Sequence, residues 1–231
     1  MFKAVATDID GTITYANKYL SFEAIDEIRR LEEDGIPVIL VTGHMLCVAG
    51  TLSEYIGTSG PLVCENGSIV TSKRWRAPLV LGSRKKTDKA LAVLKRELGK
   101  QVEVKPHIDY RVVDISLQRT FDVSEANLIL EKYKLGVYLT DSGYAIHIMD
   151  SDVNKAKGLR KAAEMIDLET SEIISIGDGK NDIPLLEETG YSIALNNAPE
   201  ELKRIADYVT RSSFGKGFAE GINHLRQNQL I

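Results

Sequence analysis

The chain has 231 residues, a formal net charge of −4 and two cysteines. Its length exceeds that of one typical domain and allows a large buried core. The composition lacks the basic surplus of nucleic-acid-binding proteins, and the longest apolar runs are too short to span a bilayer. Cys47 and Cys64 are too few for a disulfide framework, so we expect both to be reduced and buried. Because the first predicted strand begins at Phe2, we expect no leader and a cytoplasmic protein.

Strand patterns and amphipathic helix patterns alternate through the first part of the sequence. We predict, in chain order, strand 2–7, helix 21–34, strand 36–41, helix 45–56 and strand 61–65. After residue 153 the alternation resumes with a helix, strand 171–176, a helix from about 182 and short strands at 191–195 and 207–210. Such an order is typical of an α/β protein with a Rossmann-like parallel sheet.

The middle of the chain follows a different order. Helices are predicted at 87–98 and 124–133, and each is followed by two strands, at 101–105 and 112–117 and at 137–140 and 144–149. These repeated units indicate a small sheet with both helices on one face. We therefore predict a discontinuous core domain of residues 1–82 and 153–231, interrupted by an inserted α+β cap domain of residues 83–152.

Two aspartates follow the first strand, at the edge where open α/β sheets bind their ligands. Asp8 and Asp10 are two positions apart, so their side chains point the same way if the extended geometry persists beyond Thr7. Like charges at this spacing raise each other's pKa unless a cation or a hydrogen-bond donor intervenes. One carboxylate is then held protonated as a general acid, or a metal ion lies between the two, or both. A solvated Asp-Gly turn is the plainer interpretation of this segment alone.

A second acidic segment near the C-terminus repeats the pattern. An apolar strand ends in a glycine-rich turn that carries Asp178 and Asp182, and Pro184 indicates the first turn of a helix. If both strand ends face one crevice, the repulsion between the clustered carboxylates requires cations. Oxygen ligands favour Mg²⁺, and the four histidines of the chain lack the spacing of metal ligands.

Two further positions bring phosphate-binding groups to the same edge. Thr42 and Gly43 follow the strand at 36–41 and offer a hydroxyl and backbone N–H groups, while Lys155 brings a positive charge at the start of a helical segment. Each of these residues alone is ordinary in a structural role. Their order along the chain, Asp-x-Asp, Thr-Gly, Lys and Gly-Asp-x-x-x-Asp, indicates phosphate chemistry.

These segments resemble the motifs of the haloacid-dehalogenase (HAD) superfamily and, within it, of the Cof-type phosphatases. The resemblance is carried by Asp8-Ile9-Asp10-Gly11-Thr12, Val41-Thr42-Gly43, Lys155 and Gly177-Asp178-Gly179-Lys180-Asn181-Asp182. Two softer features agree, namely Glu65-Asn66-Gly67 and the pair of segments 194–198 and 206–210. One position departs from the pattern, because many Cof-type enzymes have Arg after Thr-Gly, whereas this chain has His44.

The resemblance implies the HAD fold, with a cap over the active site, and a two-step phosphoryl transfer that uses Mg²⁺. Asp8 would be the nucleophile, and Asp10 the general acid and base. The implied metal ligands are Asp8, Asp10 through its carbonyl, Asp178 and Asp182, where Asp182 is either a ligand or a partner of Lys155. The implied phosphate-binding residues are Thr42, Gly43 and Lys155, with Asn66 and Asn181 orienting groups around the site.

The resemblance further implies a small phosphorylated metabolite as substrate, 2-phosphoglycolate first among them, and a monomer or homodimer without nucleic-acid or membrane partners. Arg111, Tyr144 and His147 are the cap residues we consider for substrate contact. Three alternatives stay open. A sugar-phosphate phosphatase or phosphomutase shares all the motifs. A dehalogenase does not need the metal-binding acids, and a phospho-accepting signalling domain would lack the long insert.

Overall fold

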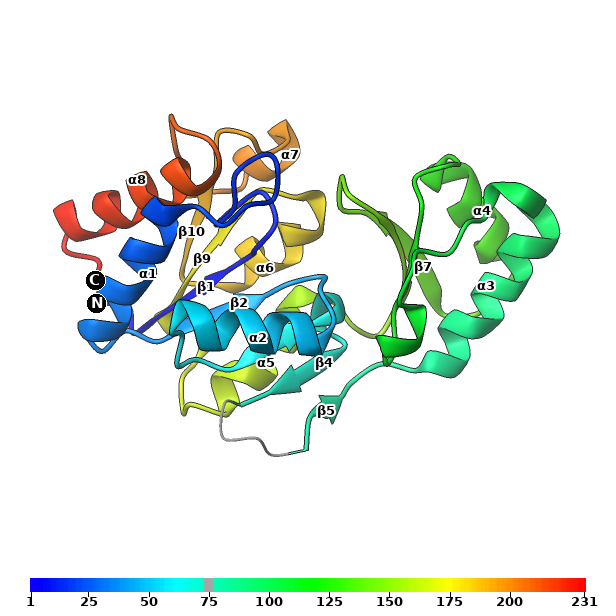
Figure 1. The fold of residues 1–231 in the computed structure, drawn as a ribbon, viewed down its shortest axis with the longest axis horizontal. Coiled ribbons are helices and arrows are strands. Elements are labelled where there is room, and N and C mark those ends of the chain that lie inside the picture. The colour runs from blue at the N-terminus through cyan, green and yellow to red at the C-terminus, as the bar shows by residue number, and fades with distance from the viewer. Residues whose placement is uncertain (73–76) are drawn as a thin grey trace.

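The computed structural model describes residues 1–72 and 77–231, which contain two separate sheets (Figure 1). The larger sheet has eight strands in the order β11-β10-β9-β1-β2-β3-β4-β5. Its strands are β1 (Ala4–Thr7), β2 (Val38–Val41), β3 (Leu62–Cys64), β4 (Ile69–Thr71), β5 (Leu79–Val80), β9 (Ile173–Gly177), β10 (Tyr191–Ala194) and β11 (Tyr208–Val209). All pairs from β11 to β3 are parallel, and β4 and β5 extend the sheet antiparallel.

Helices cover both faces of the larger sheet, as Figure 1 shows. The helices are α1 (Phe22–Glu33), α2 (Leu46–Ile56) and α8 (Phe214–Gln227) on one face, α5 (Lys155–Glu164) and α6 (Ile183–Glu188) on the other, and the short α7 (Glu200–Lys203). Side chains alternate along a strand, so Val5 packs toward α1 and α8, whereas Ala4 and Ala6 pack toward α5. Both faces of the sheet are therefore buried.

The smaller sheet is antiparallel, in the order β6-β8-β7, and two helices pack on one of its faces. These elements are α3 (Arg84–Leu98), β6 (Ile115–Leu117), α4 (Val123–Tyr133), β7 (Val137–Asp141) and β8 (Ile146–Asp150), and we call them together the cap. Leu94, Leu130 and Ile148 belong to a hydrophobic cluster of the cap that is distinct from those of the larger sheet. The predicted fold class, an α/β parallel-sheet core with an inserted α+β cap, is confirmed.

The register of the central strands brings three loops to one edge. Thr7 of β1 lies opposite Ile176 of β9 on one side and Leu40 of β2 on the other. The strands are parallel, so their carboxyl ends are nearly level, and the loops that carry Asp8, Thr42 and Asp178 leave the sheet side by side. The cap lies beyond this edge in Figure 1.

The predicted strand at 101–105 is wrong. The segment forms only an isolated bridge between Val104 and Leu117. Residues Gly99–Gln101 form a 3₁₀ turn, and Pro106 has no N–H group to continue the pairing. The cap sheet therefore has three strands within the described part of the chain, instead of the four expected.

Three other expectations need correction. The strand predicted at 112–117 begins only at Ile115, because the preceding N–H groups bind a side chain of the larger sheet. The sequence patterns did not predict β4, β5 or α8. Cys64 is buried as expected, but Cys47 is exposed. Within residues 1–72 and 77–231, no helix has both the length and the apolar character needed to cross a membrane.

Candidate active site

A cavity of about 200 Å³ lies between the strand ends of the larger sheet and the cap. Asp8, Asp10, Thr42 and Asp178 line it from the larger sheet, opposite residues of the cap. The cavity therefore suits a compact ligand.

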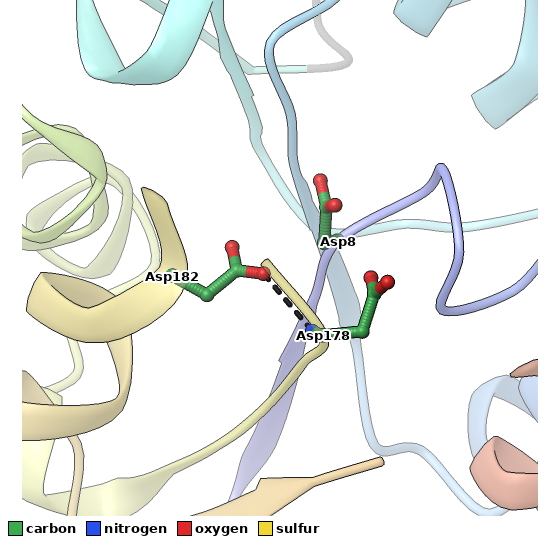
Figure 2. A group of neighbouring side chains, drawn as sticks. All are labelled: Asp8, Asp178 and Asp182. Carbon is green, nitrogen blue, oxygen red and sulfur yellow. Dashed lines mark hydrogen bonds between the residues drawn. The ribbon is translucent and has the colours of Figure 1, made fainter. Parts of the chain in front are cut away.

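Three carboxylates converge at the floor of this cavity. Asp8 follows β1, Asp178 follows β9, and Asp182 ends the 3₁₀ turn Lys180–Asp182 before α6 (Figure 2). Each offers one oxygen, and these oxygens lie within 4.8 Å of one another. Burial, together with the charges of Asp8 and Asp182, raises the pKa of Asp178 to about 8. The group therefore favours a bound cation, which would stabilise the ionised carboxylates.

The neighbourhood of Asp178 holds its carboxylate in place. Thr12 donates its hydroxyl to Oδ1 at 2.7 Å, and Asn197 donates its side-chain amide to Oδ2 at 2.9 Å. Gly11 has φ +83°, and a Cβ there would overlap the Asp178 carboxylate. Gly11 and Thr12 of the first motif therefore allow the loop after β1 to lie close to the Asp178 carboxylate.

Lys155 is the buried cation of this acidic group. Asn154 caps the N-terminus of α5 by accepting a hydrogen bond from the Lys157 N–H, so the helix begins where Lys155 can enter the site. Its Nζ lies 2.9 Å from Asp8 Oδ1 and 2.5 Å from Asp182 Oδ1. Burial outweighs the opposing charge of Lys155 and, together with the charge of Asp182, raises the pKa of Asp8 to about 6. Above that pH, Asp8 is an ionised carboxylate beside a positive charge.

Asp182 has both oxygens engaged by the protein. Its Oδ1 binds Lys155, and its Oδ2 accepts the N–H groups of Asp178 at 3.0 Å and Gly179 at 2.9 Å. These contacts are those of a residue that holds Lys155 and the β9 turn in place. They favour the second of the two roles considered for Asp182, and direct metal ligation stays a prediction.

Asp10 faces a different set of partners. Its Oδ2 lies 2.9 Å from Lys18 Nζ and 3.3 Å from His44 Nε2. Burial favours the protonated form of Asp10, but the hydrogen bonds and charges of His44 and Lys18 outweigh it and lower its pKa to about 2. Asp10 is not one of the three grouped carboxylates, and its own partners are two cations. His44, which departs from the family pattern, contacts the predicted general acid.

Thr42 and Gly43 form the wall beside Asp10. The Thr42 hydroxyl is buried and accepts the N–H of His44 at 3.1 Å, which closes the turn after β2. The carbonyl of Gly43 accepts a hydrogen bond from Arg111 of the cap at 3.1 Å. Both residues line the cavity, as a phosphate-binding role requires.

Asn66 and Asn181 belong to a polar network that reaches into the cap. Asn181 donates to Asn66 Oδ1 at 3.1 Å, and Asn66 donates to Asp114 Oδ2 at 3.4 Å. Asp114 also binds Arg111, and its Oδ2 lies 2.9 Å from His147 Nδ1. Burial would raise the pKa of Asp114, but Arg111 and His147 outweigh burial and lower it. The two predicted orienting residues thus connect the site to the cap.

Glu65 makes a second connection between the sheets. Its carboxylate accepts the backbone N–H groups of Val112 at 2.8 Å, Val113 at 2.8 Å and Asp114 at 3.0 Å. Glu65 is fully buried and has φ +47°, and Asn66 and Gly67 after it also have positive φ. Burial and the nearby Asp114 charge raise the pKa of Glu65. This loop therefore carries backbone strain and is held by the cap.

The wall of the cavity includes residues that the sequence predicted and two that it did not, Lys105 of the cap and Lys18 of the core. Arg111, Tyr144 and His147, all considered from the sequence, line it. Sequence reasoning missed Lys18, whose Nζ lies 3.9 Å from the centre of the Tyr144 ring, and it also missed Lys105. No local pattern distinguishes these lysines from others, because their neighbours in space come from distant parts of the chain.

A cavity-lining carboxylate directly after a parallel strand, paired with a buried lysine at the start of a helix and covered by a second sheet, is the arrangement of a hydrolase of the phosphoryl-transfer type. The model of the haloacid dehalogenase-like hydrolase family matches residues 5–102 and 114–222. The chain belongs to this family, which confirms the resemblance found in the sequence and sets aside the signalling-domain alternative.

Relatives of nearly equal length are known. The chain is 40% identical over 230 residues to a phosphoglycolate phosphatase of Methanosarcina acetivorans, covering 100% of this chain and 99% of the relative. It is 40% identical over 223 residues to a phosphoglycolate phosphatase of Archaeoglobus fulgidus, covering 96% of each. A crystal structure of a Thermoplasma acidophilum protein is similar, with a TM-score of 0.87, 27% identity and coverage of 98% of this chain and 99% of that one.

Proposed function

We propose that this protein is a Mg²⁺-dependent phosphatase that hydrolyses 2-phosphoglycolate to glycolate and phosphate, with Asp8 as nucleophile. The observation that carries the proposal is the ion pair of Asp8 with the buried Lys155, in which Asp8 lines the cavity between the strand ends and the cap. The relatives named phosphoglycolate phosphatase match over nearly their whole length. A sugar-phosphate phosphatase or phosphomutase would share these motifs, and a comparison of substrates separates the two interpretations.

The donor set around Asp8 fits Mg²⁺. Carboxylate oxygens are the hard ligands this ion prefers, and the raised pKa values of Asp8 and Asp178 mark a site that lacks positive charge. Asp8 and Asp178, together with the backbone carbonyl of Asp10, would hold the ion. When bound, it would neutralise phosphate oxygens and keep the nucleophile ionised.

In the first step, an oxygen of Asp8 attacks phosphorus in line with the ester bond. The bond between phosphorus and the ester oxygen breaks, and the departing glycolate oxygen takes a proton from Asp10. Lys155 and the Thr42 hydroxyl bind the transferring oxygens. Asp182 holds Lys155 in position through the 2.5 Å contact.

In the second step, water attacks the aspartyl-phosphate and gives a proton to Asp10, and phosphate leaves Asp8. The low pKa of Asp10 suits this step, because a base must be unprotonated. For the first step Asp10 must carry a proton. The negative charge of an entering phosphate raises the pKa of a neighbouring carboxylate and thus favours that protonation.

Initial rates of phosphate release test this proposal directly. We expect kcat/KM with Mg²⁺ to be higher for 2-phosphoglycolate than for glucose 6-phosphate, and Asp8→Asn to lose about 10⁴-fold or more in kcat. A folded Asp8→Asn variant with near-normal turnover would refute the nucleophile. A preference for the sugar phosphate would refute the substrate.

The domain division extends the proposal to the whole chain. We propose that residues 83–152 fold as a cap domain on a core of residues 1–82 and 153–231, supported by the hydrophobic cluster that the cap forms on its own, although Val113 of this range packs in the core. A cap that closes the cavity excludes bulk water from the reaction. A cytoplasmic location and a monomeric or dimeric state stay predictions.

A further inference from the structure

Two positive side chains of the cap, Lys105 and Arg111, line the cavity together with Lys18 of the core. Lys18 is paired with Asp10, and Arg111 is paired with Asp114. Lys105 also lines the cavity, but it has no carboxylate partner within 4.0 Å among the described residues. One cation therefore remains for an anionic group of a ligand.

Lys105 is held so that its ammonium group faces this space. Its backbone N–H donates to the Ser116 carbonyl at 2.9 Å, and Pro106 directly follows. Its Nζ donates one hydrogen bond, to the Tyr144 carbonyl at 2.8 Å. An ammonium group has three N–H bonds, so two remain for a ligand.

Ser116 and His147 stand beside Lys105 on the same wall. They face each other in the register of β6 and β8, and both line the cavity although each is almost fully buried. The Ser116 hydroxyl has no hydrogen-bond partner in residues 1–72 or 77–231. Nδ1 of His147 is paired with the Asp114 carboxylate. Lys105 and Ser116 thus lie together on this wall without an anionic partner among the described residues, beside the His147–Asp114 pair.

The electrostatics of Lys105 agree with an unmatched cation. Burial lowers its pKa, and the positive charges of Lys18 and Arg111 lower it further, while only Asp10 opposes them. An anion at Lys105 would relieve this repulsion. The acidic floor around Asp8 and Lys155 is the place for the phosphate, so the second anionic group must lie on the cap side.

We propose that Lys105 binds the carboxylate of the substrate, with the Ser116 hydroxyl as a second donor, and thereby selects phosphate esters of short hydroxy acids. This inference rests on the proposed function and adds the residue that selects the substrate. The phosphate and the carboxylate would occupy opposite walls of one small cavity. Binding energy at the cap would then discriminate between esters that share the same reacting phosphate.

The test compares two substrates that differ in the carboxylate. 2-Phosphoglycolate and ethyl phosphate share the same phosphate ester, but only the first has the carboxylate. We expect Lys105→Met to lower kcat/KM for 2-phosphoglycolate by roughly 10- to 100-fold, mainly through KM, because charged hydrogen bonds are strong. The same variant should lose much less on ethyl phosphate than on 2-phosphoglycolate, and circular dichroism checks that it is folded. Lys105→Arg should retain a large part of the preference.

Lys89→Met is the matched control, because Lys89 is an exposed lysine of α3 that does not line the cavity. It should leave both substrates unchanged. If the wild type prefers 2-phosphoglycolate over ethyl phosphate and Lys105→Met keeps that ratio, the role of Lys105 is refuted while the proposed function stands. If the wild type has no such preference, both the substrate and the role of Lys105 are wrong.

Discussion

Lys155 and Asp182 form an ion pair in which neither side chain is exposed, with Nζ and Oδ1 2.5 Å apart. Asp182 also fixes the β9 turn through two backbone N–H groups. One contact thus connects the predicted phosphate-binding lysine to the loop that carries Asp178. Buried pairs of this kind are costly to break on one side only, because the remaining charge has no partner.

Lys155→Met should therefore lose nearly all activity and about 3–5 kcal/mol of unfolding free energy. Adding Asp182→Asn should restore part of the stability, since it removes the uncompensated charge, but no activity. Urea denaturation and kcat measure the two effects. Lys161→Met, which removes an exposed lysine of α5, should cost less than about 1 kcal/mol. A double variant no more stable than Lys155→Met would contradict this account.

Asp10→Asn should slow poor leaving groups far more than good ones. Proton transfer from a positioned acid raises the rate by about 10²- to 10⁴-fold. Nitrophenolate is a good leaving group and departs with little protonation. We expect a loss in this range for 2-phosphoglycolate and a much smaller loss for p-nitrophenyl phosphate. Asp8→Asn is the control, because it should abolish both reactions. Equal losses of Asp10→Asn on the two substrates would remove Asp10 from the acid role.

Mg²⁺ should stabilise the protein more at pH 8 than at pH 5.5. The folded-state pKa values of Asp8, about 6, and Asp178, about 8, exceed the ordinary value of 3.8. Groups with a raised folded pKa stabilise the metal-free protein at low pH, and this stability is lost as the pH rises through about 6 and 8. A cation offsets the loss by stabilising the ionised forms.

Thermal unfolding with Mg²⁺ and with a chelator, at both pH values, measures this difference. Asp178→Asn should remove most of the pH dependence, because the amide does not titrate. A metal-induced rise in Tm that is the same at both pH values would contradict the prediction.

Glu65→Gln should weaken the attachment of the cap. The carboxylate accepts three N–H groups with two oxygens, whereas an amide offers one oxygen and places its own N–H groups against a donor. A buried donor left unsatisfied costs about 1–3 kcal/mol. Glu187→Gln, at an exposed position on α6, should change the stability little. Hydrogen exchange at Val112 and Val113 reports the contact itself, and unchanged protection there would disprove the role of Glu65.

Replacing residues 83–152 with a short Gly/Ser linker should leave a folded core. The cap has its own hydrophobic cluster, and Glu65 and Asn66 would become exposed to water instead of remaining buried without partners. We expect this core to hydrolyse p-nitrophenyl phosphate and to lose its preference for 2-phosphoglycolate. Circular dichroism checks folding, and a folded core with an unchanged preference would rule out substrate selection by the cap.

Local sequence was sufficient for the parts of the site that follow strands. Asp8 and Asp178 stand directly after apolar segments, so their meeting at one sheet edge follows from the parallel order. No strand end or other local pattern distinguishes Lys18, Lys105 or Asp114 in the sequence. Their partners, such as Asn66 for Asp114 across 48 residues, are defined only by how the two sheets dock.

The unpredicted helix α8 has a different physical reason. Gly215 and Gly217 lower the helix propensity of the segment. The apolar spacing of Phe218, Ile222 and Leu225 nevertheless marks a face that packs in the core. A Cβ at Gly215 would overlap Ser21 beside α1, so the close approach of α1 and α8 requires the glycine. Tertiary packing outweighs local propensity here.

Glu65 binds the cap through main-chain amides, and this has a consequence for how the cap can diversify. An amide N–H is present whatever side chain a residue has, so replacements at the exposed Val112 keep the contact, with proline as the exception. This contact is thus indifferent to the Val112 side chain, whereas Val113 is buried in the hydrophobic cluster of the larger sheet. Residues of the cap that face the substrate can therefore change while the position of the cap over Asp8 stays the same.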